Sequence, residues 1–223
     1  MRISCHVSWA LVIILSAVSS GTARAERSNE SQAKTTRAEQ WRADLQFLLE
    51  ELPIRHANLY HSISKDEFVQ AADHLNQRIP DLTDNHVIVE FARLTALVGD
   101  GHTGLFFPFD KTIPFHKYPI EVWAVSDGYI IAAASPDLAG LVGKKLVRVA
   151  DQDISQVVAA VEPLAPGDNL FSKLNKALMF LPIPEVLEAL GVIQQAFLGA
   201  ARDGRAVYAH GSDQFIAGNR TLS

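Results

Sequence analysis

The first run of apolar residues in this chain has the spacing of an α-helix. Its start is marked by Thr36 and Glu39, which are spaced as in a capping box, and its end by Pro53. Between them the apolar positions recur mostly every three or four residues, at Trp41, Leu45, Leu48, Leu49 and Leu52. The pattern predicts a first helix here, preceded by a polar leader that has no apolar period.

Two further helical patterns follow. Ser64 and Glu67 repeat the capping-box spacing, and an apolar stripe continues until Pro80. The third pattern begins at Thr83 and stops at Gly99, and its apolar positions are Val87, Val89, Phe91, Leu94 and Leu97. Three helices joined by short links predict a helical subdomain.

Beyond Tyr118 the period changes to that of strands. Residues 118–124 and 128–134 are rich in Ile, Val, Tyr and Trp, and the short link between them is typical of a hairpin. A short strand is expected to end at Val149, and a short amphipathic helix at 154–161.

The last part of the chain is helical at first and then weakly patterned. Residues 168–180 and 184–190 are predicted to be helical, with Pro182 and Pro184 separating them. One strand is expected at 205–209, in a polar and glycine-rich tail that offers no second strand to pair with it.

The N-terminus has the three parts of a secretory signal peptide. Arg2 supplies a positive charge, residues 7–18 form a mostly apolar stretch, and Ala23-Arg24-Ala25 is a small-x-small cleavage site. The apolar stretch is shorter than the ~20 residues that span a bilayer, so a stable membrane anchor is not expected. We expect cleavage at about Ala25 and export of the protein to the periplasm or the medium.

Composition narrows the possible functions. The chain has 223 residues and a formal net charge of −5, which argues against a nucleic-acid partner. Its one cysteine, Cys5, lies inside the predicted signal peptide, so neither disulfides nor thiol chemistry are expected in the exported protein.

These patterns together predict an α+β fold, with an N-terminal helical subdomain followed by a small β-rich part. The expected organisation is a signal peptide at 1–25, a disordered leader at 26–38, the helical subdomain at 39–105, the β-rich part at 106–165, a helical segment at 166–195 and a weakly ordered tail at 196–223.

A polar turn at 97–105 separates the helical pattern from the strand pattern. It carries Asp100 and His102 among three glycines, which permit unusual backbone angles and close approach of other groups. An imidazole titrates near pH ~6.5, so His102 is a candidate general base, with Asp100 as a candidate supporting carboxylate. The alternative is an ordinary helix C-terminus, with Gly99 ending the helix and His102 favoured there by the helix dipole.

The histidines do not predict a metal centre. His56 and His61 lie in one connector, and His102 and His116 are far apart in the chain. No third ligand stands at the spacing of a known metal motif. We expect neither a metal nor a cofactor.

Several segments resemble the exported serine peptidases of the tail-specific (C-terminal processing) and tricorn-related family. The resemblance rests on a helix with Trp41, Asp44 and Leu45, on the turn at 97–103, on the strand pair at 118–134, and on residues 140–149 followed by a helix at 153–161. The last of these segments resembles part of a PDZ-like module. The turn is the most specific of the four features.

The resemblance implies proteolysis of unfolded or partly degraded polypeptides. A PDZ-like module of this family binds the C-terminal end of a substrate, which would place the carboxylate on the backbone amides of Gly140, Leu141, Val142 and Gly143. His102 stands where the family has a general base that follows a serine. Gly101 occupies the place of that serine.

The family's nucleophilic serine belongs to a core that follows the PDZ-like part, and we expect that core to be absent from this chain. Ser172 lies in a predicted helix and Ser212 in the polar tail, so neither has the sharp turn that exposes a nucleophile.

Two functions are therefore expected. The first is that of an exported serine-peptidase family member, truncated and inactive alone, with a polypeptide substrate or a peptide C-terminus as its partner. The second is a non-catalytic extracytoplasmic module that binds a peptide or a protein. The sequence leaves the oligomeric state open.

Overall fold

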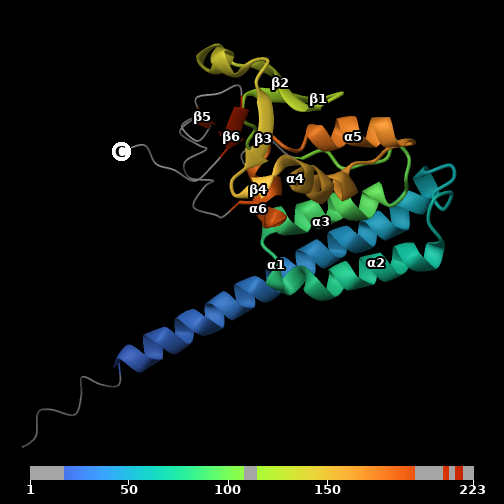
Figure 1. The fold of residues 1–223 in the computed structure, drawn as a ribbon. Coiled ribbons are helices and arrows are strands. Elements are labelled where there is room, and N and C mark those ends of the chain that lie inside the picture. Colours follow the sequence, from blue (N-terminus) through green and yellow to red (C-terminus); the bar gives the residue numbers. More distant parts are fainter. Residues whose placement is uncertain (1–17, 108–114, 194–207, 211–213, 218–223) are drawn as a thin grey trace, which may run out of the picture.

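The computed structural model describes residues 18–107, 115–193, 208–210 and 214–217, and the side chains of residues 32–107 and 115–193. Within these residues the chain has an α+β fold, as predicted. Three longer helices form one layer, and three shorter helices lie between that layer and a single sheet (Figure 1).

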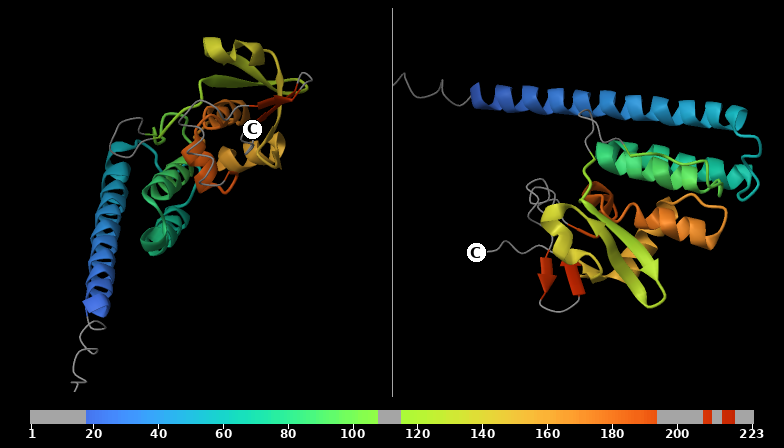
Figure 2. Two further views of the ribbon diagram at one scale, coloured as in Figure 1. Left: turned by 90° about the vertical axis from the view of Figure 1, so that its left-hand side faces the viewer. Right: turned by 90° about the horizontal axis from the view of Figure 1, so that it is seen from above.

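The first helix, α1 (Val18–Arg55), is far longer than the sequence pattern predicts. Its N-terminal part projects from the body of the molecule (Figures 1 and 2). The expectation of a disordered leader at 26–38 is therefore wrong. The side chains of residues 32–36 are exposed, which explains the missing apolar period. Once a packed helix exists, each added residue with helical propensity extends it at little cost.

Thr36 does not cap this helix, although its spacing to Glu39 suggests it. It lies inside α1, and its hydroxyl donates a hydrogen bond to the carbonyl of Gln32 at 3.0 Å. This contact satisfies the Thr36 hydroxyl within the helix, so the hydroxyl does not cap a helix start. Pro53 also lies inside α1, within its last turn.

The next two helices begin where the sequence predicts. Ser64 caps α2 (Lys65–Arg78) in a complete capping box with Glu67. Thr83 caps α3 (Asp84–Ala96) by accepting a hydrogen bond from the backbone of His86. Both starts depend on contacts within one turn, which a sequence pattern records directly.

Helix α3 is buried on two faces and belongs to two hydrophobic clusters. One face, which includes Val87, Phe91 and Leu94, packs in a cluster with α1 and α2. The opposite face packs against the sheet and the short helices through Ile88 and Val89. The helical part and the β-rich part therefore each have a cluster of their own, and α3 contributes to both.

The sheet has six strands in the order β1-β2-β3-β6-β5, with β4 paired to β3. Their bounds are β1 Ile120–Val125, β2 Gly128–Ala134, β3 Lys145–Val149, β4 Gln152–Asp153, β5 Tyr208–His210 and β6 Gln214–Ala217. Strands β1 to β4 form an antiparallel series, whereas β6 lies parallel to β3. Within this sheet β1 is an edge strand.

The tail strand expected at 205–209 does have a partner. Its described part, β5, pairs antiparallel with β6, and β6 joins β5 to the rest of the sheet. The sequence offered no partner because β6 is only four residues long and lies beside a strand distant in the chain. The rest of the tail predicted at 196–223 lies outside the described residues.

Three short helices cover one side of the sheet. They are α4 (Ile154–Val161), α5 (Leu170–Leu178) and α6 (Pro184–Ala189). The predicted bounds of α4 are confirmed, and α5 and α6 lie within the two predicted helical segments. Helix α5 contacts β1, whereas α6 contacts α3.

No helix among the described residues is long and apolar enough to cross a membrane. Residues 1–17 of the predicted signal peptide lie outside the described part of the chain. The predicted cleavage point at Ala25 falls within the described part of α1.

Substitutions at two adjacent residues of α2 can test the hydrophobic cluster formed by α1, α2 and α3. Phe68 is 1% exposed, whereas Val69 is 38% exposed on the same helix. We expect Phe68→Ala to lower the free energy of unfolding by about 3–5 kcal/mol, because it leaves a cavity. Val69→Ala is the matched control, with an expected loss below about 1 kcal/mol. Urea denaturation of both variants measures the difference, and similar losses would contradict the assignment of this core.

Candidate functional site

The turn after α3 is built on a glycine and a tight hydrogen bond. Gly99 has a φ of +73°, the left-handed conformation expected of a glycine that ends a helix. The backbone N–H of Thr103 then donates to the carbonyl of Asp100 at 3.1 Å. This geometry places the Asp100 carboxylate and the His102 imidazole on one short segment.

The Asp100 carboxylate is the centre of the local network. One oxygen, Oδ1, accepts the backbone N–H of His102 at 2.8 Å and lies 3.3 Å from His102 Nδ1. The other, Oδ2, accepts from Thr103 Oγ1 at 3.0 Å and lies 3.0 Å from His56 Nε2. Both oxygens are therefore occupied by groups of the same molecule.

The surroundings of His56 define its tautomer. Its Nδ1 accepts the backbone N–H of Asn58 at 3.1 Å, so we assign the ring proton to Nε2, which donates to Asp100. Protonation of Nδ1 would remove the hydrogen bond from Asn58. The connector after α1 thus supplies Asp100 with a neutral donor, a partnership that spacing along the sequence did not indicate.

These hydrogen bonds stabilise the charged form of Asp100. The His102 backbone N–H, and next the His56 imidazole, hold the pKa of the Asp100 carboxyl far below its ordinary value. Asp100 is therefore a carboxylate throughout the physiological range. In that state it orients the Nδ1–H of His102 and leaves His102 Nε2 as an acceptor.

His102 itself is open to solvent, with 94% of its side chain exposed. Asp100 lies within hydrogen-bond distance of His102 Nδ1 and on the other side of the ring from Nε2. Among the described residues, no serine, threonine or cysteine side chain is hydrogen-bonded to His102 Nε2. Ser172 lies in α5, as predicted, and Ser212 lies outside the described residues.

Gly101 is held from two sides by the region around α5. Its N–H donates to Asp168 Oδ1 at 2.8 Å, and its carbonyl accepts a hydrogen bond from Lys176 Nζ. A Cβ at this position would lie 2.5 Å from Asp168 Oδ2. A serine at this position would therefore displace Asp168, which explains structurally why a glycine is found here.

Asp100, His102 and Asp168 bring potential ligand atoms within 4.8 Å of one another. Asp168 lies far from this turn in the sequence, so motif spacing did not indicate it as a third ligand. Both oxygens of Asp100 already accept hydrogen bonds, and the Lys176 ammonium is bonded to the same turn. We therefore assign no metal to these groups.

Two of the four amides in the loop predicted to bind a carboxylate are paired internally. The N–H of Val142 donates to Ala139, and the N–H of Gly143 donates to Ile131 at 2.8 Å. Leu141 is buried in the core, and Gly140 lies in a short 3-10 helix (Pro136–Leu141). The amides of Val142 and Gly143 are therefore not free for the role that the resemblance implies.

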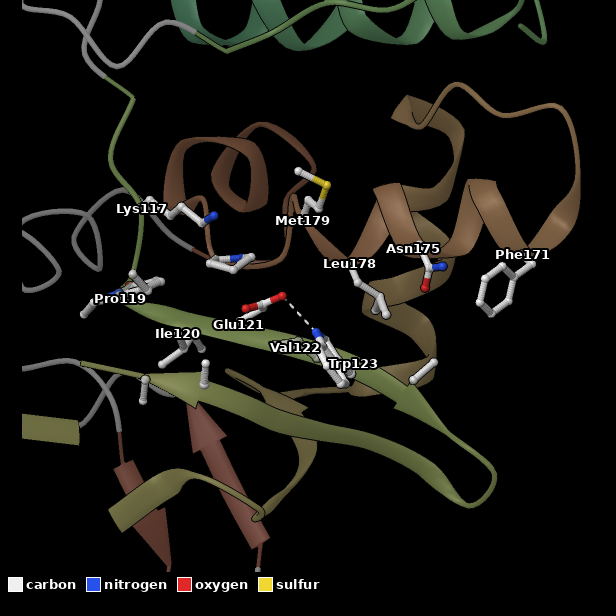
Figure 3. A pocket seen from close by; sticks show the side chains of 15 residues that line it. Lys117, Pro119, Ile120, Glu121, Val122, Trp123, Phe171, Asn175, Leu178 and Met179 are labelled. Carbon is white, nitrogen blue, oxygen red and sulfur yellow. Dashed lines mark hydrogen bonds between the residues drawn. The ribbon is translucent and has the colours of Figure 1, made fainter. Parts of the chain in front are cut away.

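A groove of about 790 Å³ lies elsewhere, between the edge strand β1 and helix α5 (Figure 3). Its strand side carries Glu121 and Trp123, and its helix side carries Phe171, Asn175 and Leu178 (Figure 3). None of the residues 140–143 lines it. Large apolar side chains at its rim are open to solvent, with Phe171 75% and Trp123 57% exposed.

One end of this groove is fixed by the segment that precedes β1. The N–H of Tyr118 donates to the carbonyl of Pro182 at 2.7 Å, and the N–H of His116 donates to Glu185 Oε2 at 2.9 Å. Burial, and next the Glu185 carboxylate, raises the pKa of the Tyr118 hydroxyl above its usual range. Lys117 lies between these anchors and lines the groove.

The sequence did not identify the groove, although part of its signal was present. Phe171, Asn175 and Leu178 have the spacing of one helical face. The strand side could not be identified from the sequence, because β1 becomes an edge only when β2, β3 and β6 assemble on its other side. Exposed Trp123 and Phe171 meet only in the folded chain.

Comparison of the chain with protein-family models, with curated proteins and with solved structures finds no match. The function is therefore inferred from the geometry of the turn and of the groove.

The contact at Gly101 predicts a specific coupling. We expect Gly101→Ala to destabilise the protein by about 1–2 kcal/mol, because the new Cβ displaces Asp168 and removes its hydrogen bond. In an Asp168→Ala background the same change should cost much less, since the obstructing carboxylate is gone. Urea denaturation of the four proteins measures the coupling.

Gly140→Ala is the matched control for this cycle, because nothing lies within 4 Å of the added Cβ. It should change stability by less than about 0.5 kcal/mol. Additive effects of the changes at Gly101 and Asp168 would contradict the proposed contact.

The lowered pKa of Asp100 predicts a loss of stability in acid. The stabilisation is complete above the ordinary aspartate pKa of about 3.9 and is lost as the pH falls from there toward the folded-state pKa. Asp100→Asn removes this titration, so its free energy of unfolding should fall less steeply between pH 4 and 2. Asp73→Asn, on the exposed face of α2, should keep the wild-type slope. Equal slopes for wild type and Asp100→Asn would refute the prediction.

Proposed function

We propose that this chain binds polypeptide in an extended conformation, in the groove between β1 and α5. The observation that carries the proposal is the combination of an edge strand with a neighbouring helix across an open, partly apolar groove. An edge strand presents unpaired N–H and C=O groups on its outer side, which an incoming strand can pair with. PDZ domains use this mode of binding.

The side chains of the groove suit a peptide better than a small polar molecule. Alternate residues of an added strand point to opposite faces, so every second side chain of the peptide can meet the helix side. That side offers Phe171, Leu178 and Met179 as apolar contacts, and Asn175 as an amide. The backbone would supply affinity and these contacts the preference for particular side chains.

We propose further that the chain is a substrate-handling region related to the exported tail-specific peptidases, with a PDZ-like β-rich part. The signal-peptide pattern at 1–25 supports export, and the turn with Asp100 and His102 supports the relationship. Placing the peptide at β1 differs from the carboxylate loop implied by the resemblance. The reason is that the amides of Val142 and Gly143 are already paired.

Peptide hydrolysis by this chain alone is not proposed. His102 has an orienting carboxylate, but acyl transfer also needs a nucleophile within hydrogen-bond reach of the base. Among the described side chains, none with a hydroxyl or a thiol is paired with His102 Nε2. The Asp100–His102 pair is therefore best interpreted as a trace of the relationship.

Strand addition can be tested with N-methylated peptides, because N-methylation removes a backbone donor without changing the side chain. In an added strand only every second N–H points toward the protein. A labelled extended peptide methylated on one alternate set of amides should bind about tenfold more weakly, while the other set should have little effect. Fluorescence anisotropy measures both affinities.

Protein variants place this binding in the groove. Trp123→Ala should weaken binding, whereas Phe47→Ala, which removes a similarly exposed aromatic ring on α1, should not. Equal effects of the two methylation patterns, or no binding by wild type, would refute the proposed function. Cleavage of an unfolded polypeptide, blocked by a serine-directed acylating reagent, would refute the claim that the chain does not hydrolyse peptides.

A further inference from the structure

Glu121 and Trp123 form a defined pair on the strand side of the groove. They are two residues apart on β1, so their side chains lie on the same face of the strand. The indole Nε1–H of Trp123 donates to Glu121 Oε1 at 2.8 Å (Figure 3). This bond fixes the edge of the indole and leaves Glu121 Oε2 free of it.

The charge of Glu121 is not neutralised by a basic group in the described part of the chain. None of the ion pairs found there includes Glu121, although Lys145 and Asp127 pair on the same hairpin. Lys117 also lines the groove but lies four residues earlier.

The pair combines the two groups that recognise an organic cation. A cation lying on an indole face is attracted by the ring, and a carboxylate beside it adds charge and hydrogen-bond acceptors. Trp123 is more than half exposed, so its ring is open to such a contact. A guanidinium fits both partners, because it is planar, stacks on aromatic rings and donates in a fork to a carboxylate.

We propose that the Glu121–Trp123 pair selects a basic side chain, arginine before lysine, in the extended peptide bound at β1. This inference rests on the proposed function and adds the side-chain class that the groove prefers. Val122, between them on the opposite face of β1, packs in one cluster with Leu178 of α5. The peptide positions next to the basic residue point to that side and would meet the apolar contacts of α5, Phe171 and Met179. The preferred ligand is therefore an extended segment with one basic residue directly flanked by apolar residues.

Four labelled peptides of one sequence test the inference. They differ at a central position, which is arginine, lysine, citrulline or glutamate; citrulline keeps the shape of arginine without its charge. With wild-type protein at low salt we expect arginine to bind about five- to tenfold more tightly than citrulline, with lysine between them. This ratio should shrink as salt is raised.

Variants at Glu121 separate recognition from folding. Glu121→Gln should reduce the preference for arginine over citrulline to about twofold or less. Glu121→Lys should reverse the ranking, so that the glutamate peptide binds more tightly than the arginine peptide. Glu39→Gln, an exposed change on α1, is the matched control and should keep the wild-type ratio. Each result is a ratio within one protein, so partial unfolding of a variant cancels.

The outcomes distinguish this inference from the proposed function. Equal binding of the arginine and citrulline peptides by wild type, or no reversal with Glu121→Lys, overturns the inference and leaves strand addition standing. Failure of all four peptides to bind overturns the proposed function. Self-association of the wild type in sedimentation, abolished by Trp123→Ala, would assign the groove to a second copy and also overturn the inference.

Discussion

The burial of α3 on two opposite faces is the constraint on which the rest of this structure depends. Val87 and Phe91 close the helical cluster, while Ile88 and Val89 close the cluster beneath the sheet. A helix packed on both sides has little freedom to shift, because either cluster would lose contacts. The turn that follows α3 therefore leaves the core at a fixed point, with Asp100 and His102 at its tip.

Helix α5 connects this turn to the groove. Lys176 bonds to the carbonyl of Gly101, whereas Phe171 and Asn175 line the groove beside β1. One short helix thus presents different faces to two candidate sites. A ligand in the groove would contact an element that also holds the turn, although the turn itself has no nucleophile in the described residues.

The carboxylates of the two sites, Asp100 and Glu121, differ in how many hydrogen bonds they accept from the protein. The Asp100 carboxylate is saturated by donors from its own turn and from His56, so it acts inside the molecule. The Glu121 carboxylate has one indole donor and faces an open groove. A carboxylate whose oxygens are already hydrogen-bonded within the protein organises the fold. A carboxylate with an oxygen left open to solvent can bind a ligand.

Local interactions were determined by the sequence alone. Ser64 and Thr83 begin their helices through contacts within one turn, and Gly99 turns the chain two residues after the C-cap of α3, because the left-handed conformation favours glycine. The helical state of residues 26–38 was not predicted, because residues 32–36 are exposed and leave no apolar period. Hydrophobic periodicity reports burial and only indirectly reports backbone conformation.

Only the tertiary structure decided which distant groups meet. The partnership of His56 with Asp100, the contact of Asp168 with Gly101, and the position of β6 beside β3 each join segments far apart in the chain. The groove has the same origin, since β1 is an edge only through the order of the whole sheet. The sequence determined most of the elements and several of their ends, and packing alone determined the sites, because a site is made of neighbours in space.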